Sequence, residues 1–553
     1  MALTKATNRM ISGANANVLD FGAVGDGVTD DTVAIQAAID SGSKNVFFPE
    51  GSFKITSTIT ISTIISISGN GINGGSEIHS YGSNDKMFNF TNSFTLSSLS
   101  FKSKGDTDQF IFADSLAEGC IIKDCKFDWA DGTGANGSNG WGVSLANSSH
   151  VHIYRNTFKN GWRDTTYHAG NVGPETGENL KRVLTVQNTD SDSDVTFENN
   201  TLDDIYTGCY FGNCNNLRVS NNNVLTSADT VFFDRATVGY TTNKTYSNNI
   251  IKNAGKGAIK CLDTNNNTAG VGGANASIVG NVIENFGMKI GTAAIFVAGG
   301  YDGGYAYDSN TRNSSISISG NSILETDASS CHEPLALTNI DDAVISNNSF
   351  YMLGSSTDVW DFAAWSRFTM TGNNITVAGR IYIGNSVLKA VITGNNFNCY
   401  DYIELNNTNS ASPEPNRMVF TFSNNHVKTI DSDATRPTYG IKFSNNTGGY
   451  GSLNITGNTF ETNLAFSDSN ATGTPHILNI PTGGNIIDYT LVDNNAVIFT
   501  DKVASQKLLG GDILYPIYYS GYKGSATIDE STGVVTYKKD ENRTSVNTIT
   551  PTT

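Results

Sequence analysis

The chain has few basic residues, few prolines and no long apolar run. Its 35 Lys and Arg stand against 52 Asp and Glu, which gives a formal net charge of −17. Binding to nucleic acid requires a basic surface, so this balance argues against DNA or RNA as a partner. No stretch approaches the roughly 18 apolar residues of a membrane-spanning helix, and the opening MALTKATNRM lacks the apolar centre of a signal peptide. Neither membrane insertion nor Sec-dependent export is therefore predicted.

Cysteine is also scarce, and its spacing matches no metal site. The chain has 7 cysteines, an odd number, and they form no Cys-x-x-Cys pair and no zinc-finger spacing. Such usage favours a protein folded in a reducing cytosol over a disulfide-stapled secreted one. We expect no metal and no cofactor. The cysteines lie at positions 120, 125, 209, 214, 261, 331 and 399.

What the sequence does contain, from about residue 94 onward, is one phrase repeated with variations: alternating apolar residues, an Asn or a pair of Asn, and another apolar residue. The starts of the copies are 22 to 44 residues apart, a period typical of stacked coils. The copies are VHIYRNTF (151–158), VTFENNTL (195–202), LRVSNNNV (217–224), KTYSNNII (244–251), ASIVGNVI (276–283), ISISGNSI (316–323), AVISNNSF (343–350), FTMTGNNI (368–375), AVITGNNF (390–397), FTFSNNHV (420–427) and LNITGNTF (453–460).

Each copy is predicted to form a strand, a one-residue corner and a second strand. Asn tolerates the left-handed backbone conformation that such a corner needs, and its amide can hydrogen-bond to the Asn stacked above it, so we expect an Asn ladder. A further short strand precedes most copies, for example in GCYFGNC, GAIKCLD and RIYIGN. Short strands in each turn, separated by loops of variable length, describe a single-stranded parallel β-helix. An antiparallel sandwich or a propeller would not require Asn at the same place in every unit.

Residues 29–41 are predicted to form a helix that covers the open N-terminal end of the stack. Thr29 is the expected N-cap, and apolar residues such as Ala34, Ile35 and Ala38 recur at helical spacing. A helix of this kind would protect the strand edges that the first coil leaves exposed.

The Asn phrase fades after about residue 485, where short β segments around turns indicate a separate module. The expected organisation is an N-terminal arm (1–15), a capping segment (16–60), the β-helix (61–485) and a small C-terminal β module (486–553).

Side-chain parity indicates which residues of the preceding strands face outward. Three aromatic residues among them, Tyr210, Phe232 and Phe296, are candidates for a platform on which sugar rings stack. A subunit interface explains exposed aromatics as well, so both interpretations stay open. The outward positions are predicted to be Ser144, Thr185, Tyr210, Phe232, Lys260, Phe296, Ala336, Asp361, Tyr382, Glu404 and Lys442.

Carboxylates gather on one part of this face. Glu333 and Asp358 stand at strand entrances of adjacent coils, about 5 Å apart at the spacing of neighbouring strands, and Asp361 shares a coil with Asp358. Asp361 and Glu404 are two coils apart, roughly 9 to 10 Å. Glycoside hydrolysis needs two carboxyl groups about 5 Å apart for retention or roughly 6.5–9.5 Å apart for inversion, so both geometries are available. The competing interpretation is that acidic residues on a solvated sheet serve solubility alone.

Further candidate sugar-binding residues surround these acids. Tyr382 and Glu404 continue the outward row, and the insertion AGGYDGGYAYDSNTR (298–312) offers Asp302 among three tyrosines. Aromatic faces stack on pyranose rings, and carboxylates accept hydrogen bonds from paired hydroxyls. The insertion is equally compatible with a plain surface loop.

The passage NVLDFGAVGDGVTDDTVAIQAAIDSG and the following NVFFPEGSFKI (17–55) resemble the N-terminal signature of pectate-lyase-like β-helix proteins, a group that includes many phage tailspikes. The fold that this resemblance implies is all-β: a right-handed single-stranded parallel β-helix with an N-terminal capping helix and a small C-terminal β module. Tailspikes that cleave O-antigen place a Glu on one coil and an Asp-x-x-Asp pair on the next. Glu333, Asp358 and Asp361 match that arrangement in type and order.

A tailspike-like chain is expected to belong to the virion tail and to act at the outside of the bacterial host cell, after assembly in the host cytoplasm. The resemblance implies a homotrimer attached to tail or baseplate proteins, with O-antigen or capsular polysaccharide as its ligand.

Three functions compete on this evidence. The first is an endo-glycosidase with Glu333, Asp358 and Asp361 as catalytic residues. The second is a polysaccharide lyase that acts by β-elimination, and the third is a non-catalytic receptor-binding fibre. The hydrolase is favoured over the lyase, because the outward row offers only Lys260 and Lys442 to neutralise an acidic sugar.

Overall fold

The structure is a computed structural model, and almost all of its regular structure is β-strand. No helix among the described residues has the length and apolar character needed to cross a membrane. The described residues are 15–81, 86–104, 109–114, 119–129, 141–161, 182–187, 193–237, 242–264, 274–287, 293–298, 315–325, 333–338, 340, 342–352, 358–363, 367–383, 387, 389–399, 403–406, 418–429, 439–444, 450–461, 464–468, 478–479, 486–488, 496–497, 499–500, 515–519, 522–528, 535–539 and 546–549.

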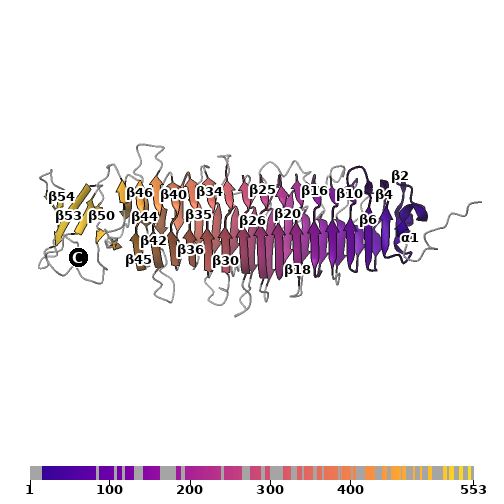
Figure 1. The fold of residues 1–553 in the computed structure, drawn as a ribbon, viewed down its shortest axis with the longest axis horizontal. Helices are drawn as coiled ribbons and strands as arrows, with labels where there is room; N and C mark the ends of the chain where they lie inside the picture. The colour runs from indigo at the N-terminus through magenta and orange to yellow at the C-terminus, as the bar shows by residue number, and fades with distance from the viewer. Residues whose placement is uncertain are drawn as a thin grey trace, which may run out of the picture. The chain divides into compact units, whose positions relative to one another are not determined.

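The chain divides into two compact units, residues 1–304 with 308–314 and residues 305–307 with 315–553. Within each unit the strands form coils: a strand pairs in parallel with the strand three elements later, so three strands in succession complete one turn (Figure 1). The three stacks of strands are called sheets A, B and C here. The predicted fold, a right-handed parallel β-helix, is confirmed.

The first unit contributes strands to all three sheets. Sheet A is made of β1 (Ala16–Asn17), β3 (Asn45–Phe48), β6 (Ile65–Gly69), β9 (Phe94–Ser97), β12 (Cys120–Lys123), β15 (Val151–Tyr154), β18 (Asp194–Glu198), β21 (Asn216–Ser220), β24 (Thr242–Ser247) and β27 (Ala274–Val279). Sheet B is made of β2 (Asp26–Asp30), β4 (Gly51–Ile55), β7 (Ser76–Ser80), β10 (Ser100–Ser103), β13 (Lys126–Asp128), β16 (Thr157–Lys159), β19 (Thr201–Asp203), β22 (Asn223–Val224), β25 (Ile250–Lys252) and β28 (Val282–Glu284). Sheet C is made of β5 (Ile59–Ile61), β8 (Lys86–Phe90), β11 (Gln109–Asp114), β14 (Trp141–Ala146), β17 (Arg182–Gln187), β20 (Thr207–Gly212), β23 (Phe232–Thr237), β26 (Ile259–Thr264) and β29 (Ile295–Ala298).

The second unit repeats this plan. Its sheet A is made of β30 (Ser315–Ser319), β33 (Asp342–Ser346), β36 (Arg367–Thr371), β39 (Lys389–Thr393), β42 (Met418–Ser423) and β45 (Tyr450–Thr456). Its sheet B is made of β31 (Ser322–Leu324), β34 (Ser349–Met352), β37 (Asn374–Val377), β40 (Asn396–Cys399), β43 (His426–Thr429), β46 (Thr459–Glu461) and β49 (Ile486–Asp488). Its sheet C is made of β32 (Leu335–Thr338), β35 (Asp358–Ala363), β38 (Arg380–Ile383), β41 (Ile403–Asn406), β44 (Tyr439–Ser444) and β47 (Leu464–Asp468).

Strand pairing changes character near the C-terminus. A short parallel pair, β48 (Leu478–Asn479) with β51 (Phe499–Thr500), is followed by an antiparallel sheet. That sheet consists of β50 (Ala496–Val497), β52 (Tyr515–Tyr519), β53 (Tyr522–Ile528), β54 (Val535–Lys539) and β55 (Val546–Ile549). The four predicted domain ranges themselves stay predictions.

Stacked side chains fill the interior of the first unit. Phe101, Phe127 and Phe158 hold the same position in successive coils and are fully buried. Their ring centroids lie 5.2 and 4.9 Å apart, with the ring planes within 9° of parallel. This spacing is close to that of neighbouring strands, so equal residues one coil apart stack face to face.

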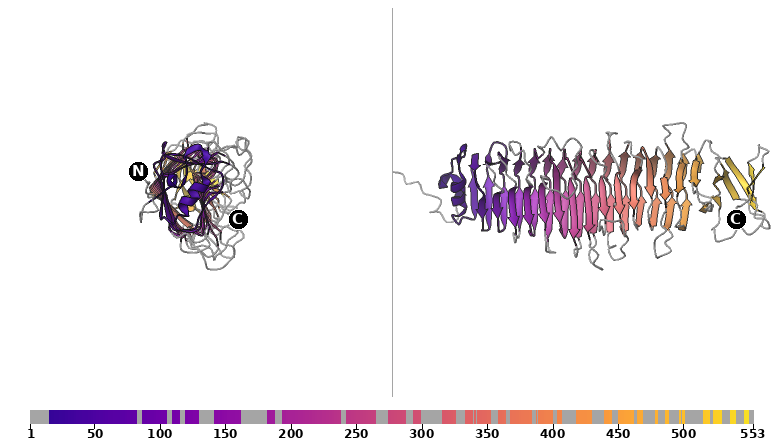
Figure 2. Two further views of the ribbon diagram at one scale, coloured as in Figure 1. Left: turned by 90° about the vertical axis from the view of Figure 1, so that its right-hand side faces the viewer. Right: turned by 180° about the vertical axis from the view of Figure 1, so that it is seen from behind.

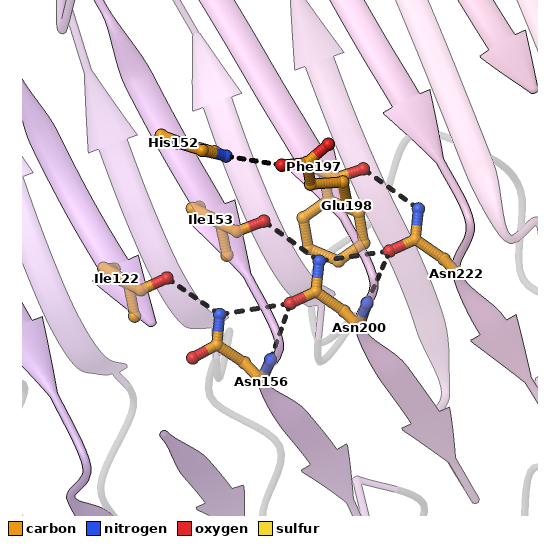
Figure 3. A network of polar contacts seen from close by, with 8 residues as sticks. All are labelled: Ile122, His152, Ile153, Asn156, Phe197, Glu198, Asn200 and Asn222. Carbon is orange, nitrogen blue, oxygen red and sulfur yellow. Dashed lines mark hydrogen bonds and ion pairs between the residues drawn. The ribbon is translucent and has the colours of Figure 1, made fainter. Parts of the chain in front are cut away.

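A buried row of asparagines follows the corner between sheets A and B (Figure 3). The Oδ1 atom of Asn200 accepts hydrogen bonds from the backbone N–H and the side-chain amide of Asn156, one coil earlier, at 2.9 and 3.1 Å. Its Nδ2 donates to the carbonyl oxygen of Ile153 at 3.0 Å. Satisfying these amides removes the penalty of burying them, and the predicted Asn ladder is confirmed. Its members are Asn156, Asn200, Asn222, Asn249 and Asn281 in the first unit, and Asn321, Asn348, Asn373, Asn395, Asn425 and Asn458 in the second.

The residue ahead of each ladder Asn makes the turn itself. Asn199 has a left-handed φ of 56°, and Gly280 does the same with 66°. A corner therefore needs two residues, one that turns the backbone and one that stays inside. The predicted one-residue corner is wrong on this point, because the frequent Asn-Asn pairs hide the division of tasks.

Helix α1 (Thr32–Ile39) lies across the N-terminal end of the first unit (Figure 2, left) and packs Ile35 and Ala38 against the interior. The helix begins three residues after the predicted N-cap, because Thr29 belongs to β2 and its hydroxyl donates to Asp26 at 2.8 Å. Asp31 precedes the helix without capping it. Its carboxylate instead accepts from the backbone N–H groups of Val24 and Gly25 at 2.6 and 3.1 Å, which fixes the turn of the sequence signature.

Candidate functional site

The predicted outward positions of the first unit form one row across sheet C. Strand pairing places Ser144 beside Thr185, Thr185 beside Tyr210, and Lys260 beside Phe296. The row between Tyr210 and Lys260 is completed by Phe233. Parity therefore assigns the row correctly in every strand of the unit that it was applied to except β23, but Ser144 and Thr185 are buried in it rather than open to solvent.

Phe232 was predicted to face outward, and this prediction is wrong. It pairs with Cys209, is fully buried, and lies 6.4 Å from the Phe197 ring. The outward residue is its neighbour Phe233. The misassignment has a physical cause, since the next inward position is Asp234, a charged residue that a parity argument places outside.

Aromatic and cationic side chains interleave along this row. The rings of Tyr210 and Phe233 meet edge to face at 5.4 Å. The Lys260 ammonium lies 5.2 Å from the centroid of the Phe233 ring and 5.8 Å from that of Phe296. We call these residues, Tyr210, Phe233, Lys260 and Phe296, the aromatic row. Half-buried rings held in place by cations form a rigid, amphipathic surface.

Arg182 extends the aromatic row at one end. Its guanidinium carbon lies 4.8 Å from the centroid of the Tyr210 ring. Burial lowers the pKa of Arg182, whereas Tyr210 and Asp229 act in the opposite direction. Asp229 in turn forms an ion pair with Lys256 at 3.1 Å. The strand entrances beside the row thus carry charges of both signs.

Sheet C of the second unit holds the predicted acidic residues. Leu335 pairs with Trp360 and Ala336 with Asp361. Glu333 and Asp358 each lie two residues ahead of the paired Leu335 and Trp360, so they occupy matching places in adjacent strands. Asp358 and Asp361 thus lie on β35, and Glu333 lies two residues ahead of the neighbouring β32.

The register is irregular at these acids. Asp358 pairs with Arg380 and Asp361 with Tyr382, so three steps along β35 match two along β38. Such a β-bulge re-aims side chains and is over-represented next to active sites. Beyond it, Tyr382 pairs with Glu404, and Glu404 with Lys442.

Arg380 is a residue that sequence reasoning missed. It forms an ion pair with Glu404, whose side chain is 6% exposed, and its guanidinium carbon lies 5.1 Å from the Tyr382 ring centroid. The sequence did contain a signal for Arg380: it precedes Tyr382 by two residues and therefore lies on the same face of the strand. Glu404, predicted as an open ligand-binding carboxylate, is buried under this arginine instead.

Two predicted features fall outside these contacts. Asp302, like the rest of its insertion after Ala298, lies outside the described residues, and for Asp358 and Asp361 the structure describes the backbone. No group of three or more His, Cys, Asp or Glu within the described ranges is arranged to hold a metal ion.

A comparison with protein families finds a match that includes the sequence signature at residues 17–55. Residues 15–260 match the family of rhamnogalacturonase A/epimerase, pectate-lyase-like proteins. The predicted resemblance is confirmed. The pectate-lyase-like region contains the capping helix and the aromatic row as far as Lys260.

Individual relatives match over short lengths or at low identity. Mannuronan C5-epimerase AlgE5 of Azotobacter vinelandii is 54% identical over 44 residues, which are 7% of this chain and 4% of that protein. The surface adhesin PfbA of Streptococcus pneumoniae is 16% identical, with 69% of this chain and 97% of that chain covered and a TM-score of 0.45. The tailspike protein of E. coli bacteriophage HK620 is 14% identical over 93% of this chain and 84% of that chain, with a TM-score of 0.36.

Proposed function

We propose that this protein is a tailspike that binds a bacterial surface polysaccharide, O-antigen or capsule, and hydrolyses it within the chain. Glu333, Asp358 and Asp361 are the proposed catalytic residues. They supply an acid for the leaving oxygen, a base for water and an electrostatic partner.

The observation that carries the proposal is the pairing of β32, β35 and β38. Glu333 lies two residues ahead of β32, Asp358 holds the corresponding place in the adjacent β35, and Asp361 stands three residues on, across a β-bulge. Two carboxyl groups that share a site repel each other as anions, so one of them is proposed to keep its proton and act as the general acid.

Glycan binding is proposed for the aromatic row, with Phe233 in place of Phe232, and for Tyr382 in the second unit. Half-buried rings with one open face suit pyranose rings. The Arg380–Glu404 ion pair is proposed to orient Tyr382 rather than to contact the reacting atoms.

The decisive experiment incubates the full chain with purified O-antigen or capsular polysaccharide and follows polymer size, reducing ends and absorbance near 235 nm. New reducing ends without absorbance support hydrolysis. Absorbance gain identifies β-elimination and therefore a lyase, and binding without any change in polymer size identifies a receptor-binding fibre.

Substitutions then locate the site. Glu333→Gln, Asp358→Asn and Asp361→Asn are each expected to abolish cleavage while binding persists. The matched control is Asp342→Asn, an exposed acid on sheet A of the same unit, which should leave the rate unchanged. Full activity in the three variants would reject this site.

The proposed assembly is a homotrimer on the virion tail, joined to tail or baseplate proteins and acting outside the host cell. Its support is the sequence resemblance to tailspikes. Light scattering of the purified chain should give about three times 59.0 kDa; a monomer would contradict the trimer without touching the site.

A further inference from the structure

A lysine and an aspartate meet inside the core of the first unit. Asp234 lies on β23 of sheet C and Lys244 on β24 of sheet A, the next strand of the same coil. The two side chains form an ion pair, and both are 0% exposed. The contact crosses the interior of the coil from one sheet to the other.

Both residues occupy positions that are apolar in the neighbouring coils. Asp234 stands between Phe211 and Cys261 in the register of sheet C. Lys244 stands between Leu217 and Ala276 in sheet A. All four neighbours are buried, so these two charged side chains replace apolar ones at successive inward positions of one coil.

The surrounding side chains keep water away from the pair. Phe232 and Tyr246 flank it, both fully buried, with ring centroids 6.3 Å apart. Burial raises the pKa of the Tyr246 hydroxyl well above its usual value, so the phenol stays protonated. In such surroundings two full charges are costly, and transfer of a proton from the ammonium to the carboxylate yields a neutral amine and a neutral acid.

We propose that Lys244 and Asp234 join in the folded protein through an intramolecular isopeptide bond. The Lys244 Nζ lone pair attacks Asp234 Cγ, one C–O bond of the carboxyl group breaks, and that oxygen leaves as water. The water takes one proton from the acid and one from the amine, and the product is a neutral secondary amide. No oxidant, metal or activated donor is required.

The placement of Lys244 beside Asp234 makes this condensation feasible. The fold holds the two groups in contact, and well-oriented partners react with effective molarities on the order of 10⁵ M or more. The released water escapes to solvent, while the apolar lining excludes the water that would reverse the reaction. The product replaces two buried charges with an amide, and it closes residues 234–244 into a covalent ring that ties sheet C to sheet A.

Mass spectrometry of the full chain tests the proposal directly. The folded wild-type protein should be about 18 Da lighter than its sequence, the mass of one lost water. After unfolding and trypsin digestion, the segments 219–235 and 236–252 should appear as one branched species, uncleaved after Lys244. Fragment ions must start from both Val219 and Ala236, since a linear peptide 219–252 has the same mass but one amino terminus.

Variants separate this bond from other water losses. Lys244→Met and Asp234→Ala should each return the mass to the sequence value. Lys252→Met removes a half-exposed lysine that pairs with Glu284 at 3.2 Å, and it should keep the deficit. The wild-type measurement does not depend on any variant being able to fold. If folded wild-type protein yields the separate unmodified peptides 219–235 and 236–244, the proposal is overturned and the contact is a plain buried ion pair.

Discussion

At the scale of single residues, the Asn ladder separates two roles that the sequence places side by side. Asn200 is buried and accepts from Asn156, whereas Asn199 is exposed with a left-handed φ of 56°. Asn200→Ala removes the acceptor of two N–H groups and the donor to Ile153. Each such loss costs about 1–3 kcal/mol, so the free energy of unfolding should fall by several kcal/mol in denaturant titration.

Asn199→Gly is the matched control for that change. Glycine adopts the left-handed region without steric cost, so this variant should unfold within about 0.5 kcal/mol of wild type. Equal losses in the two variants would show that the ladder bonds do not carry the stability assigned to them.

The adjacent phenylalanines of β23 give a second residue-scale prediction. Phe232→Ala empties a core position and should cost about 3–5 kcal/mol, seen as a lower Tm. Phe233→Ala should change Tm little and weaken polysaccharide binding, measured by calorimetry on the isolated glycan. The reverse pattern, with Phe233 needed for stability and Phe232 for binding, would restore the outward position that parity gave to Phe232.

Residue-level prediction from the sequence succeeded where a position is apolar inside and polar outside. Tyr210, Lys260, Tyr382 and Glu404 were placed on the correct face of their strands for this reason. It failed at β23, because the buried Asp234–Lys244 pair reverses the pattern. Burial of Glu404 was equally hidden, since it depends on Arg380 one strand earlier in the stack.

At the scale of elements, α1 closes the first coil with one face. Ile35 is fully buried, whereas Val33 in the same turn is 81% exposed. Ile35→Ala should lower the free energy of unfolding by about 2–5 kcal/mol, and Val33→Ala should change it by less than about 0.5 kcal/mol. Thermal unfolding of both variants measures the difference; equal Tm shifts would mean that α1 does not protect the strand edges beneath it.

Coils were predictable from the sequence because each repeats a local rule. Alternating apolar residues define the strands, and the ladder Asn defines the corner, so neither depends on distant context. The start of α1 was not predictable in this way. Thr29 was expected to cap it, but the Asp31 carboxylate accepts from Val24 and Gly25, and Asp30 accepts from Thr32 and Thr56. Tertiary hydrogen bonds decide where this helix begins.

At the scale of the whole molecule, stacked coils give each unit a continuous core, whereas the candidate catalytic residues are confined to a few strands. The bulge between Asp358 and Asp361 cannot be read from spacing, because it arises from a mismatch between two strands in different coils. Stability, by contrast, should be shared along a stack of coils, since each coil buries its faces only against its neighbours.

Buried thiols report on that shared stability. Burial raises the pKa of Cys120 and of Cys125 to about 12, so neither forms a thiolate in the folded state near neutral pH. In the unfolded chain a thiol has a pKa of about 8.5. A thiol whose pKa is higher in the folded state contributes its full stabilisation below the pKa of the unfolded chain. That stabilisation is lost as the pH rises above this pKa. The free energy of unfolding should therefore decline above about pH 8.5, by roughly 1.4 kcal/mol per pH unit for each such thiol.

Thiol labelling at pH 8 tests the same point in a Cys331→Ser background, which removes the cysteine outside the described residues. A thiol-reactive disulfide reagent should react with the folded protein only as fast as the chain opens, and the thiols of the first unit should react together if its coils unfold as one cooperative unit. Rapid labelling of Cys125 in native protein would contradict its burial. Staggered labelling of Cys120 and Cys261 would instead show that coils of the first unit open one after another, because their thiolates can form only where the neighbouring coil has already left.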